Sequence, residues 1–285
     1  MAFNLQTFKT RAITAFVFVG VMLLGMLWNQ WSFFFLFSVI HFGCWREYQQ
    51  LVGRIDEAYQ TITPFHRYGI MLAGWCMMLY ATDQPLQLGE IPLHAIGFYM
   101  GLVALFGLPL IEVLFTRQLN LKNIFYSAAG LVYISLSFTL LIDIRMQGQI
   151  LGTDFGWIAP LVLIASIWIN DTMAYLVGSW IGKHPLSKVS PKKTWEGTIG
   201  GILLSVALVS LMGYGVHSYV VPVFAIIALI ASVAGTFGDL LESKLKRMAG
   251  VKDSGQIMPG HGGFLDRFDS LLLATPFTWL FLKLL

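Results

Sequence analysis

The sequence predicts an all-α, polytopic integral membrane protein, and two observations support this fold class. Hydrophobic residues fill 56% of the 285 positions and charged residues only 12%, with a mean hydropathy of +0.71. Soluble domains carry about 25% charged residues, so the chain is too apolar for a soluble fold. The second observation is that the apolar residues form long runs separated by short polar segments, which is typical of membrane-spanning helices.

Nine of these runs are candidate spans, because a helix needs about 20 apolar residues to cross a bilayer. They cover 12–28, 31–46, 68–82, 91–115, 123–143, 156–182, 197–216, 219–238 and 271–285. Lys9 and Arg11 precede the first run in the charge order of a signal sequence. That run is longer than the apolar part of a signal peptide, and a second run follows directly, so we expect an uncleaved first helix. Asn29-Gln30 leaves room only for a tight turn, which predicts a helical hairpin.

The distribution of basic residues predicts the orientation of these spans. If the N-terminus is cytoplasmic, 16 of the 18 Lys and Arg residues fall in cytoplasmic segments, and only Arg145 and Lys283 lie on the other side. Such a split follows the positive-inside rule. Fusing the first two runs into one span would invert most of the later loops, so we reject an eight-span topology. Because the chain is short and has no polar tail, we expect it in a bacterial cytoplasmic (inner) membrane.

Composition also excludes several kinds of site. A net charge of +3 is too small to indicate a nucleic-acid partner. The two cysteines, Cys44 and Cys76, lie inside apolar runs, so we expect buried core residues and neither a disulfide nor a metal site.

Polar content divides the chain into two regions. Residues 1–150 hold about five of the predicted helices, and their longest polar segment, 47–67, is expected to be a connector rather than a binding loop. Residues 151–285 hold the other helices and most of the polar motifs, so we expect the catalytic region there, with a polar cavity at the cytoplasmic face. Small residues such as Gly97 and Gly201 should let helices pack closely.

The most polar stretch, 238–269, combines three kinds of group. Carboxylates bind Mg²⁺, Lys and Arg bind phosphate oxygens, and glycines let backbone N–H groups approach an anion. The stretch therefore predicts a site for a polyanion held through a metal ion. A solvated, salt-bridged loop is the alternative, but it does not explain a Gly-His-Gly-Gly run beside Asp-Arg-x-Asp. The charged residues are Asp239, Glu242, Lys244, Lys246, Arg247, Lys252, Asp253, Asp266, Arg267 and Asp269.

Two pairs of carboxylates in this stretch have helical spacing. Asp239 and Glu242 are three residues apart, as are Asp266 and Asp269, so each pair would share one helix face. Like charges at this distance repel each other unless a cation lies between them. Asp239 ends the eighth predicted span, where Gly238 leaves room beside it.

Asp171 lies inside the sixth predicted span. A charge within the hydrocarbon is costly, so an intramembrane Asp is a candidate functional residue. The alternative is a neutral Asp that is hydrogen-bonded to a neighbouring helix.

A lysine-rich segment, 188–197, precedes the seventh predicted span. Ser190 is expected to cap this helix, with Pro191 in its first turn. Lys192 and Lys193 would then stand beside free helix N–H groups, a combination that favours phosphate. The alternative is an ordinary cytoplasmic lysine cluster.

From Ser243 to Asp269, the stretch SKLKRMAGVKDSGQIMPGHGGFLDRFD resembles the signature of the phosphatidate cytidylyltransferases, or CDP-diacylglycerol synthases. Met258 stands where the family usually has Leu, Ile or Phe. The segment SPKKTWEG, 190–197, looks like a second characteristic segment of this family. The resemblance covers about residues 165–270, and the first 150 residues match only in hydropathy. The signature positions are Ser243, Lys246, Arg247, Lys252, Asp253, His261, Gly262, Gly263, Asp266, Arg267 and Asp269.

The resemblance implies transfer of CMP from CTP to phosphatidate, giving CDP-diacylglycerol and pyrophosphate in phospholipid biosynthesis. It implies Mg²⁺ on Asp239, Asp266 and Asp269, with Asp171 as a fourth candidate. Lys193 joins the catalytic set, and His261 is open as a catalytic helper, a phosphate donor or a structural residue. Phosphate-binding candidates are Lys192, Lys193, Lys246, Arg247, Lys252 and Arg267. Other substrate-binding candidates are Ser190, Thr194, Ser243, Asp253, Gly262 and Gly263.

Two other functions are considered. A transporter or channel could relay ions through Asp171 and Asp239, but no inverted repeat is evident in the sequence and the charges cluster on one side. A related CTP-dependent enzyme could act on another lipid phosphate or a polyprenol. The number of metal ions, a role for a monovalent cation and the oligomeric state, including a homodimer, are open.

Overall fold

The computed structural model describes residues 5–82, 86–115, 120–147, 149–150, 153–154, 156–256 and 262–285. These residues form two compact units, Met1–Met146 with Met248–Arg267, and Gln147–Arg247 with Phe268–Leu285. Each of the nine predicted spans coincides with a helix in the described residues. The predicted all-α fold is therefore confirmed.

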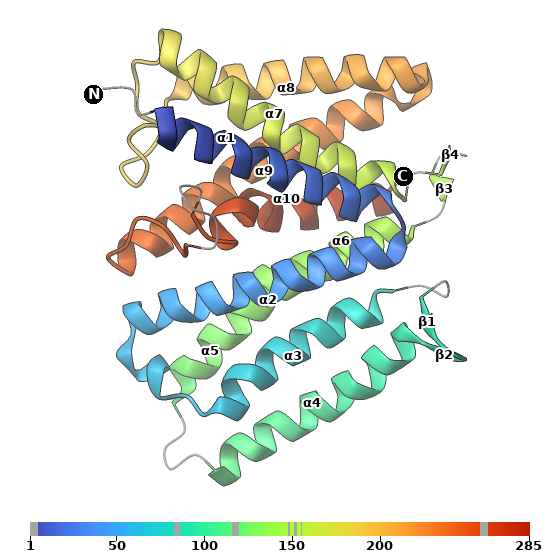
Figure 1. The fold of residues 1–285 in the computed structure, drawn as a ribbon, viewed down its shortest axis with the longest axis vertical. Helices are drawn as coiled ribbons and strands as arrows, with labels where there is room; N and C mark the ends of the chain where they lie inside the picture. The colour runs from blue at the N-terminus through green and yellow to red at the C-terminus, as the bar shows by residue number, and fades with distance from the viewer. Residues whose placement is uncertain are drawn as a thin grey trace. The chain divides into compact units, whose positions relative to one another are not determined.

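The first unit is built mainly from helices (Figure 1). A two-stranded antiparallel ribbon joins α3 to α4, and α5, η2 and α6 follow one another without a break. Its elements are α1 (Leu5–Leu27), α2 (Gln30–Ile55), η1 (Glu57–Thr61), α3 (Pro64–Tyr80), β1 (Gln87–Leu88), β2 (Ile91–Pro92), α4 (Leu93–Phe115), α5 (Leu121–Gly130), the π-helix η2 (Leu131–Leu136) and α6 (Ser137–Met146).

A capping box fixes the turn between α1 and α2. The Asn29 side chain accepts a hydrogen bond of 2.8 Å from Ser32 N, and Ser32 Oγ accepts one of 3.0 Å from Asn29 N. Gly25 packs against Leu36, whose Cδ2 would lie 2.6 Å from a Cβ at that glycine. The predicted hairpin is therefore confirmed.

Helix α2 forms much of the core of the first unit. Phe37, Cys44 and Trp45 are all fully buried, and Trp45 donates a hydrogen bond of 2.8 Å to Ser135 Oγ. Cys44 and Cys76 are both buried free thiols, as predicted.

The second unit contains a short antiparallel ribbon and four long helices, two of which begin or end in the first unit. Its elements are β3 (Gln149–Ile150), β4 (Thr153–Asp154), α7 (Ile158–Ile181), α8 (Trp195–Val216), the short helix η3 (Ser218–Val220), α9 (Val221–Met248) and α10 (Leu265–Lys283). Small residues bring α7 and α8 together: a Cβ at Gly197 would lie 2.7 Å from Ala174 O, and one at Gly201 would lie 2.9 Å from Asn170 O. The predicted close packing at Gly201 is confirmed.

Five helical segments in the described residues are long and apolar enough to cross a membrane. They are Leu93–Phe115, Leu121–Met146, Ile158–Ile181, Trp195–Val216 and Ser218–Met248. They support a multi-pass membrane protein. Membrane crossing by α1, α2, α3 and α10 stays a prediction.

Two helices continue beyond the ends expected from hydropathy. Helix α2 reaches Ile55, so the first part of the predicted connector 47–67 is helical, and Leu51 and Val52 on it are buried. Helix α9 reaches Met248, so Asp239 lies inside the helix and not at its end. Both extensions carry charged residues, such as Arg54 on α2 and Lys244 on α9, so their mean hydropathy falls although the helix continues.

Candidate active site

Asp239 and Asp269 lie where α9 and α10 approach each other closely. A Cβ at Gly238 would lie 2.5 Å from Asp269 O, and one at Gly235 would lie 3.3 Å from Ser270 Cβ. Only a glycine at position 238 allows this approach without a shift of the backbone. The predicted room beside Asp239 is therefore present, and it is filled by the second carboxylate-bearing helix.

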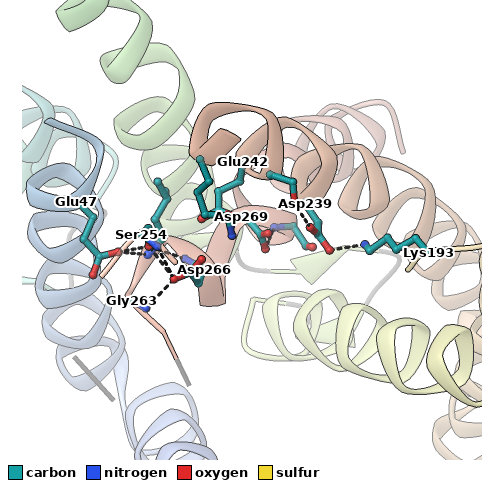
Figure 2. A network of polar contacts seen from close by, with 12 residues as sticks. Glu47, Lys193, Asp239, Glu242, Ser254, Gly263, Asp266 and Asp269 are labelled. Atoms are coloured by element: carbon teal, nitrogen blue, oxygen red, sulfur yellow. Dashed lines mark hydrogen bonds and ion pairs between the residues drawn. The ribbon is translucent and has the colours of Figure 1, made fainter. Parts of the chain in front are cut away.

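Asp239 is contacted by two residues that the sequence motifs indicate. Lys193 Nζ forms an ion pair with Asp239 Oδ2, and Ser243 Oγ donates a hydrogen bond of 3.2 Å to Asp239 Oδ1. Figure 2 shows the Lys193 side chain extended toward Asp239. The structure thus brings together one residue from the lysine-rich segment and two from the polar stretch 238–269.

Asp269 is buried beside other carboxylates. Its side chain is 8% exposed, and its Oδ1 accepts a hydrogen bond of 2.6 Å from Ser270 N. Burial is the main cause that raises the pKa of the Asp269 carboxyl to about 8; the nearby charges of Asp239 and Asp171 also raise it, while the hydrogen bond from Ser270 N and the charge of Lys193 lower it. We call Asp171, Asp239 and Asp269 the acidic cluster. Its mutual repulsion would be relieved by a bound cation.

The donor set of the acidic cluster suits Mg²⁺. Proteins commonly hold this ion by one or two carboxylates, while water and substrate phosphates complete its shell. Asp239 and Asp269 provide such a pair. In the described part of the chain, no three His, Cys, Asp or Glu side chains gather closely enough to hold a metal by themselves. The residues therefore fit an ion that shares its coordination with water and phosphate, and not a closed protein cage.

Asp266 is engaged by its own loop within the first unit. Its Oδ2 accepts hydrogen bonds of 2.8 Å from Ser254 N and 2.8 Å from Gly263 N, and Ser254 Oγ lies 2.9 Å away. Gly262 has a φ of +80°, and a Cβ there would lie 2.6 Å from Asp266 Oδ2. One role of Asp266 is thus to hold the loop that leads into α10. Its binding of a metal ion stays a prediction.

Glu47, on α2, anchors the same loop from the other side. The Glu47 side chain is 6% exposed and lies 2.6 Å from Ser254 Oγ, while Phe264 N and Leu265 N donate bonds of 2.9 Å and 2.8 Å to its carboxylate. Figure 2 shows this carboxylate directed at Ser254. A Cβ at Gly263 would overlap the carboxylate. We call Glu47, Ser254, Gly263 and Asp266 the loop anchor.

The sequence motifs do not indicate Glu47. It stands at the start of the segment expected to be a connector, far from the signature. One signal was available: Glu47 is a carboxylate beside Cys44, Trp45, Tyr48 and Leu51, whose spacing matches a buried helix face. A buried carboxylate on such a face needs hydrogen-bond donors. Here they come from the segment that joins α9 to α10 and from the first residue of α10; we call this segment the signature loop.

Comparisons with known proteins agree with the signature. The model of the cytidylyltransferase family matches residues 9–285. The chain belongs to this family. The resemblance seen in the signature stretch is thereby confirmed and extends to the N-terminal helices.

Several relatives in the family carry the name phosphatidate cytidylyltransferase. One from Brucella abortus is 33% identical over 282 residues, covering 97% of this chain and 94% of the relative. One from Bacillus subtilis is 38% identical over 190 residues, covering 64% of this chain and 68% of the relative. One from Synechocystis is 43% identical over 132 residues, covering 46% of this chain and 45% of the relative.

In this member of the family, the lysine-rich segment folds differently from the expectation. Helix α8 begins at Trp195, and its cap is Thr194, whose Oγ1 accepts a hydrogen bond of 3.1 Å from Gly197 N. The predicted cap at Ser190 is wrong. The segment before Thr194 instead folds back on itself, since Leu186 N donates to Lys193 O at 2.7 Å. This fold directs Lys193 toward Asp239, while Lys192 is exposed.

The remaining predicted residues fall into three groups. Lys246 forms an ion pair with the fully buried Glu242 on the same helix face. Exposed side chains belong to Arg247, Lys252, Asp253 and Arg267, and those of Arg247 and Arg267 have further interactions within the chain. His261 lies outside the described residues, so its three alternative roles stay open.

Proposed function

We propose that this protein transfers CMP from CTP to phosphatidate, giving CDP-diacylglycerol and pyrophosphate. The observation that carries the proposal is the acidic cluster with Lys193 at Asp239, in a chain of the cytidylyltransferase family. The names of the relatives, one of which matches 97% of the chain, support phosphatidate as the acceptor.

In this reaction, an oxygen of the phosphatidate phosphate attacks the α-phosphorus of CTP. A new P–O bond forms while the bond to the bridging oxygen of the β-phosphate breaks, and pyrophosphate leaves. A phosphate monoester is largely ionised at neutral pH, since its second pKa is about 6, so no strong general base is required. Both reactants are anionic, so neutralising their charge is the main catalytic task.

The candidate site residues are suited to that task. Asp239 and Asp269 would hold Mg²⁺, with Asp171 and Asp266 as further candidates, and the ion would supply positive charge to the phosphates. Lys193, whose ammonium group contacts Asp239, would bind a phosphate oxygen at the same place. Ser243 orients the Asp239 carboxylate through its hydrogen bond to Oδ1. Lys192, Lys246, Arg247, Lys252 and Arg267 are further candidates for binding the phosphates.

The substrates suggest how the protein is oriented. Phosphatidate keeps its acyl chains in the bilayer and its phosphate at the interface, while CTP arrives from the cytosol. We therefore expect nine spans in the inner membrane, with the active site in a cavity that opens to the cytoplasm and to the inner leaflet. The bacterial relatives and the basic-residue distribution support this topology. A homodimer stays a prediction.

The test uses purified protein in detergent with phosphatidate, Mg²⁺ and radiolabelled CTP. We expect label in the organic phase, and we expect EDTA to abolish it. Bound CTP without lipid label would point to a different acceptor, such as another lipid phosphate or a polyprenyl phosphate. If the protein neither labels lipid nor binds CTP, the cytidylyltransferase reaction is refuted.

A further inference from the structure

The first unit contains a cavity of about 1280 Å³ whose lining residues have no role in the proposed reaction described above. It lies among α2, η1, α3 and the signature loop. Its walls carry three arginines, of which Arg46 and Arg54 belong to α2 and Arg67 to α3. We call it the basic cavity.

Polar contacts fix the position of Arg67 on the cavity wall. Its guanidinium donates a hydrogen bond of 3.3 Å to Gln60 O, and its own carbonyl accepts one of 3.0 Å from Gln49 Nε2. Gln60 Nε2 in turn donates one of 2.6 Å to Gly53 O. These bonds connect the start of α3, η1 and the end of α2. The acceptor of the Arg67 guanidinium is a backbone carbonyl, which is neutral, so the positive charge of Arg67 is not balanced by a carboxylate in this contact.

The basic cavity has an excess of positive charge. Among the described residues, none of the ion pairs involves Arg46, Arg54 or Arg67. Glu47 is the acidic side chain that lines the cavity, and its oxygens accept hydrogen bonds from the signature loop. Arginine presents several donors in a plane and binds phosphate through two parallel hydrogen bonds. The cavity is therefore suited to a phosphate group.

The other end of the cavity is apolar. Val39 and Phe42 line it from α2, and Met71 from α3. Val39 is separated from Arg54 by about 22 Å along the helix, at 1.5 Å per residue. The lining thus changes from guanidinium groups to hydrocarbon, which matches an amphiphile with a phosphate head and an acyl tail. A nucleotide would leave the apolar end unused.

We propose that the basic cavity binds the phosphate group of an anionic lipid, with an acyl chain along Val39, Phe42 and Met71. The loop residues Gly255 and Phe264 line the same cavity, and Phe264 packs so closely on Gly43 that a Cβ there would overlap its ring. A bound lipid phosphate would therefore contact the loop that carries Asp266. Naming phosphatidate as the lipid rests on the proposed function.

The experiment measures lipid binding without CTP. Full-length protein in dodecylmaltoside is titrated with dioleoyl phosphatidate, and bound lipid is measured by native mass spectrometry. We expect Arg46→Gln, Arg54→Gln and Arg67→Gln each to raise the Kd about tenfold, because each removes a charged donor to the phosphate. Lys122→Gln is the matched control, since Lys122 is an exposed cation of the same unit outside the cavity. Arg67→Lys keeps the charge and should bind more tightly than Arg67→Gln.

Two probes identify the source of the phosphate group. Dioleoyl phosphatidylcholine, which has no net charge, should bind equally to the wild type and the variants. If the arginine variants bind phosphatidate as tightly as Lys122→Gln does, the inference is overturned. It is also overturned if the variants lose affinity for tripolyphosphate but keep that for phosphatidate, because the cavity would then take a soluble polyphosphate.

The two proposals fail in different ways. A wild type that labels lipid from CTP, with arginine variants that bind and react normally, would refute the cavity inference alone. A wild type that labels no lipid, with variants that bind phosphatidate weakly, would refute the transfer of CMP to phosphatidate and keep the lipid site. Each variant is first checked for the same melting temperature as Lys122→Gln, so that loss of binding is not loss of fold.

Discussion

Ser254 Oγ lies 2.6 Å from Glu47 Oε2, a contact between residues 207 positions apart in the sequence. Through it, the signature loop is held to α2, a helix that has no recognisable motif. The same carboxylate accepts hydrogen bonds from Phe264 N and Leu265 N at the start of α10. A negative charge at a helix N-terminus is favourable, because these N–H groups have no partner inside the helix.

Replacing Glu47 should therefore disturb catalysis from outside the acidic cluster. A glutamine at position 47 has one acceptor oxygen where the loop requires two, and its amide would face a backbone N–H. We expect Glu47→Gln to lower the free energy of unfolding by about 1–3 kcal/mol and kcat by roughly tenfold, since each 1.4 kcal/mol on the barrier is a factor of ten. Thermal melting and CTP turnover in detergent measure the two effects.

Glu57→Gln is the control for this change, because Glu57 is an exposed carboxylate on the neighbouring η1. Glu47→Asp keeps the charge and should recover part of kcat. Equal turnover in Glu47→Gln and Glu57→Gln would mean that the loop anchor is not needed for catalysis.

The helices could be predicted from the sequence because hydropathy is a local property. The ends of α2 and α9 could not, since these ends carry exposed charges beside the buried residues Leu51, Val52 and Glu242, which lowers the local hydropathy before the helix ends. Lys193 and Asp239, which form an ion pair, each belong to a polar segment that the sequence singles out, so both residues were already candidates. Glu47 and the basic cavity depend on contacts between distant segments, and no local pattern in the sequence encodes them.

Gly238 sets the spacing between the two carboxylate-bearing helices. A methyl group there would meet Asp269 O at 2.5 Å, and backbone atoms cannot move aside as a flexible side chain can. We expect Gly238→Ala to lower the free energy of unfolding by about 1–3 kcal/mol, the usual cost of overpacking, and to reduce turnover by displacing Asp269. Thermal melting and CTP turnover check both.

Gly215→Ala is the matched control for Gly238→Ala. Gly215 is also helical, but no atom lies within 4 Å of the position its Cβ would take. Alanine is favoured over glycine inside a helix by roughly 0.5–1 kcal/mol, so this variant should be as stable as the wild type or slightly more stable. If Gly238→Ala behaves in the same way, α9 and α10 do not approach as closely as described.

Thr194 and Ser190 distinguish the observed start of α8 from the expected one. Thr194→Ala removes the hydrogen bond to Gly197 N, and loss of such a cap costs about 1 kcal/mol. Ser190→Ala should leave the melting temperature unchanged, because Ser190 contributes its carbonyl and not its side chain to the bond with Lys193 N. The opposite ranking in thermal melts would restore Ser190 as the cap.

The acidic cluster yields the most direct prediction about the chemistry. Asp239→Asn and Asp269→Asn keep the size of each side chain but remove the charge that would hold a cation, so we expect turnover to fall by at least about 100-fold. The two variants should differ little from the wild type in stability. Asp239→Asn removes the partner of Lys193, but both side chains of this ion pair are 28% exposed and such pairs contribute little, so the melting temperature should change only slightly. Asp269→Asn replaces a buried carboxyl, whose ionised form is disfavoured by burial, with a neutral amide of the same size, so it should be at least as stable as the wild type. Glu90→Gln, an exposed carboxylate in the turn between β1 and β2, is the control. Full activity in either Asn variant would remove that carboxylate from the site, whereas lost activity with retained or raised stability would separate a catalytic role from a structural one.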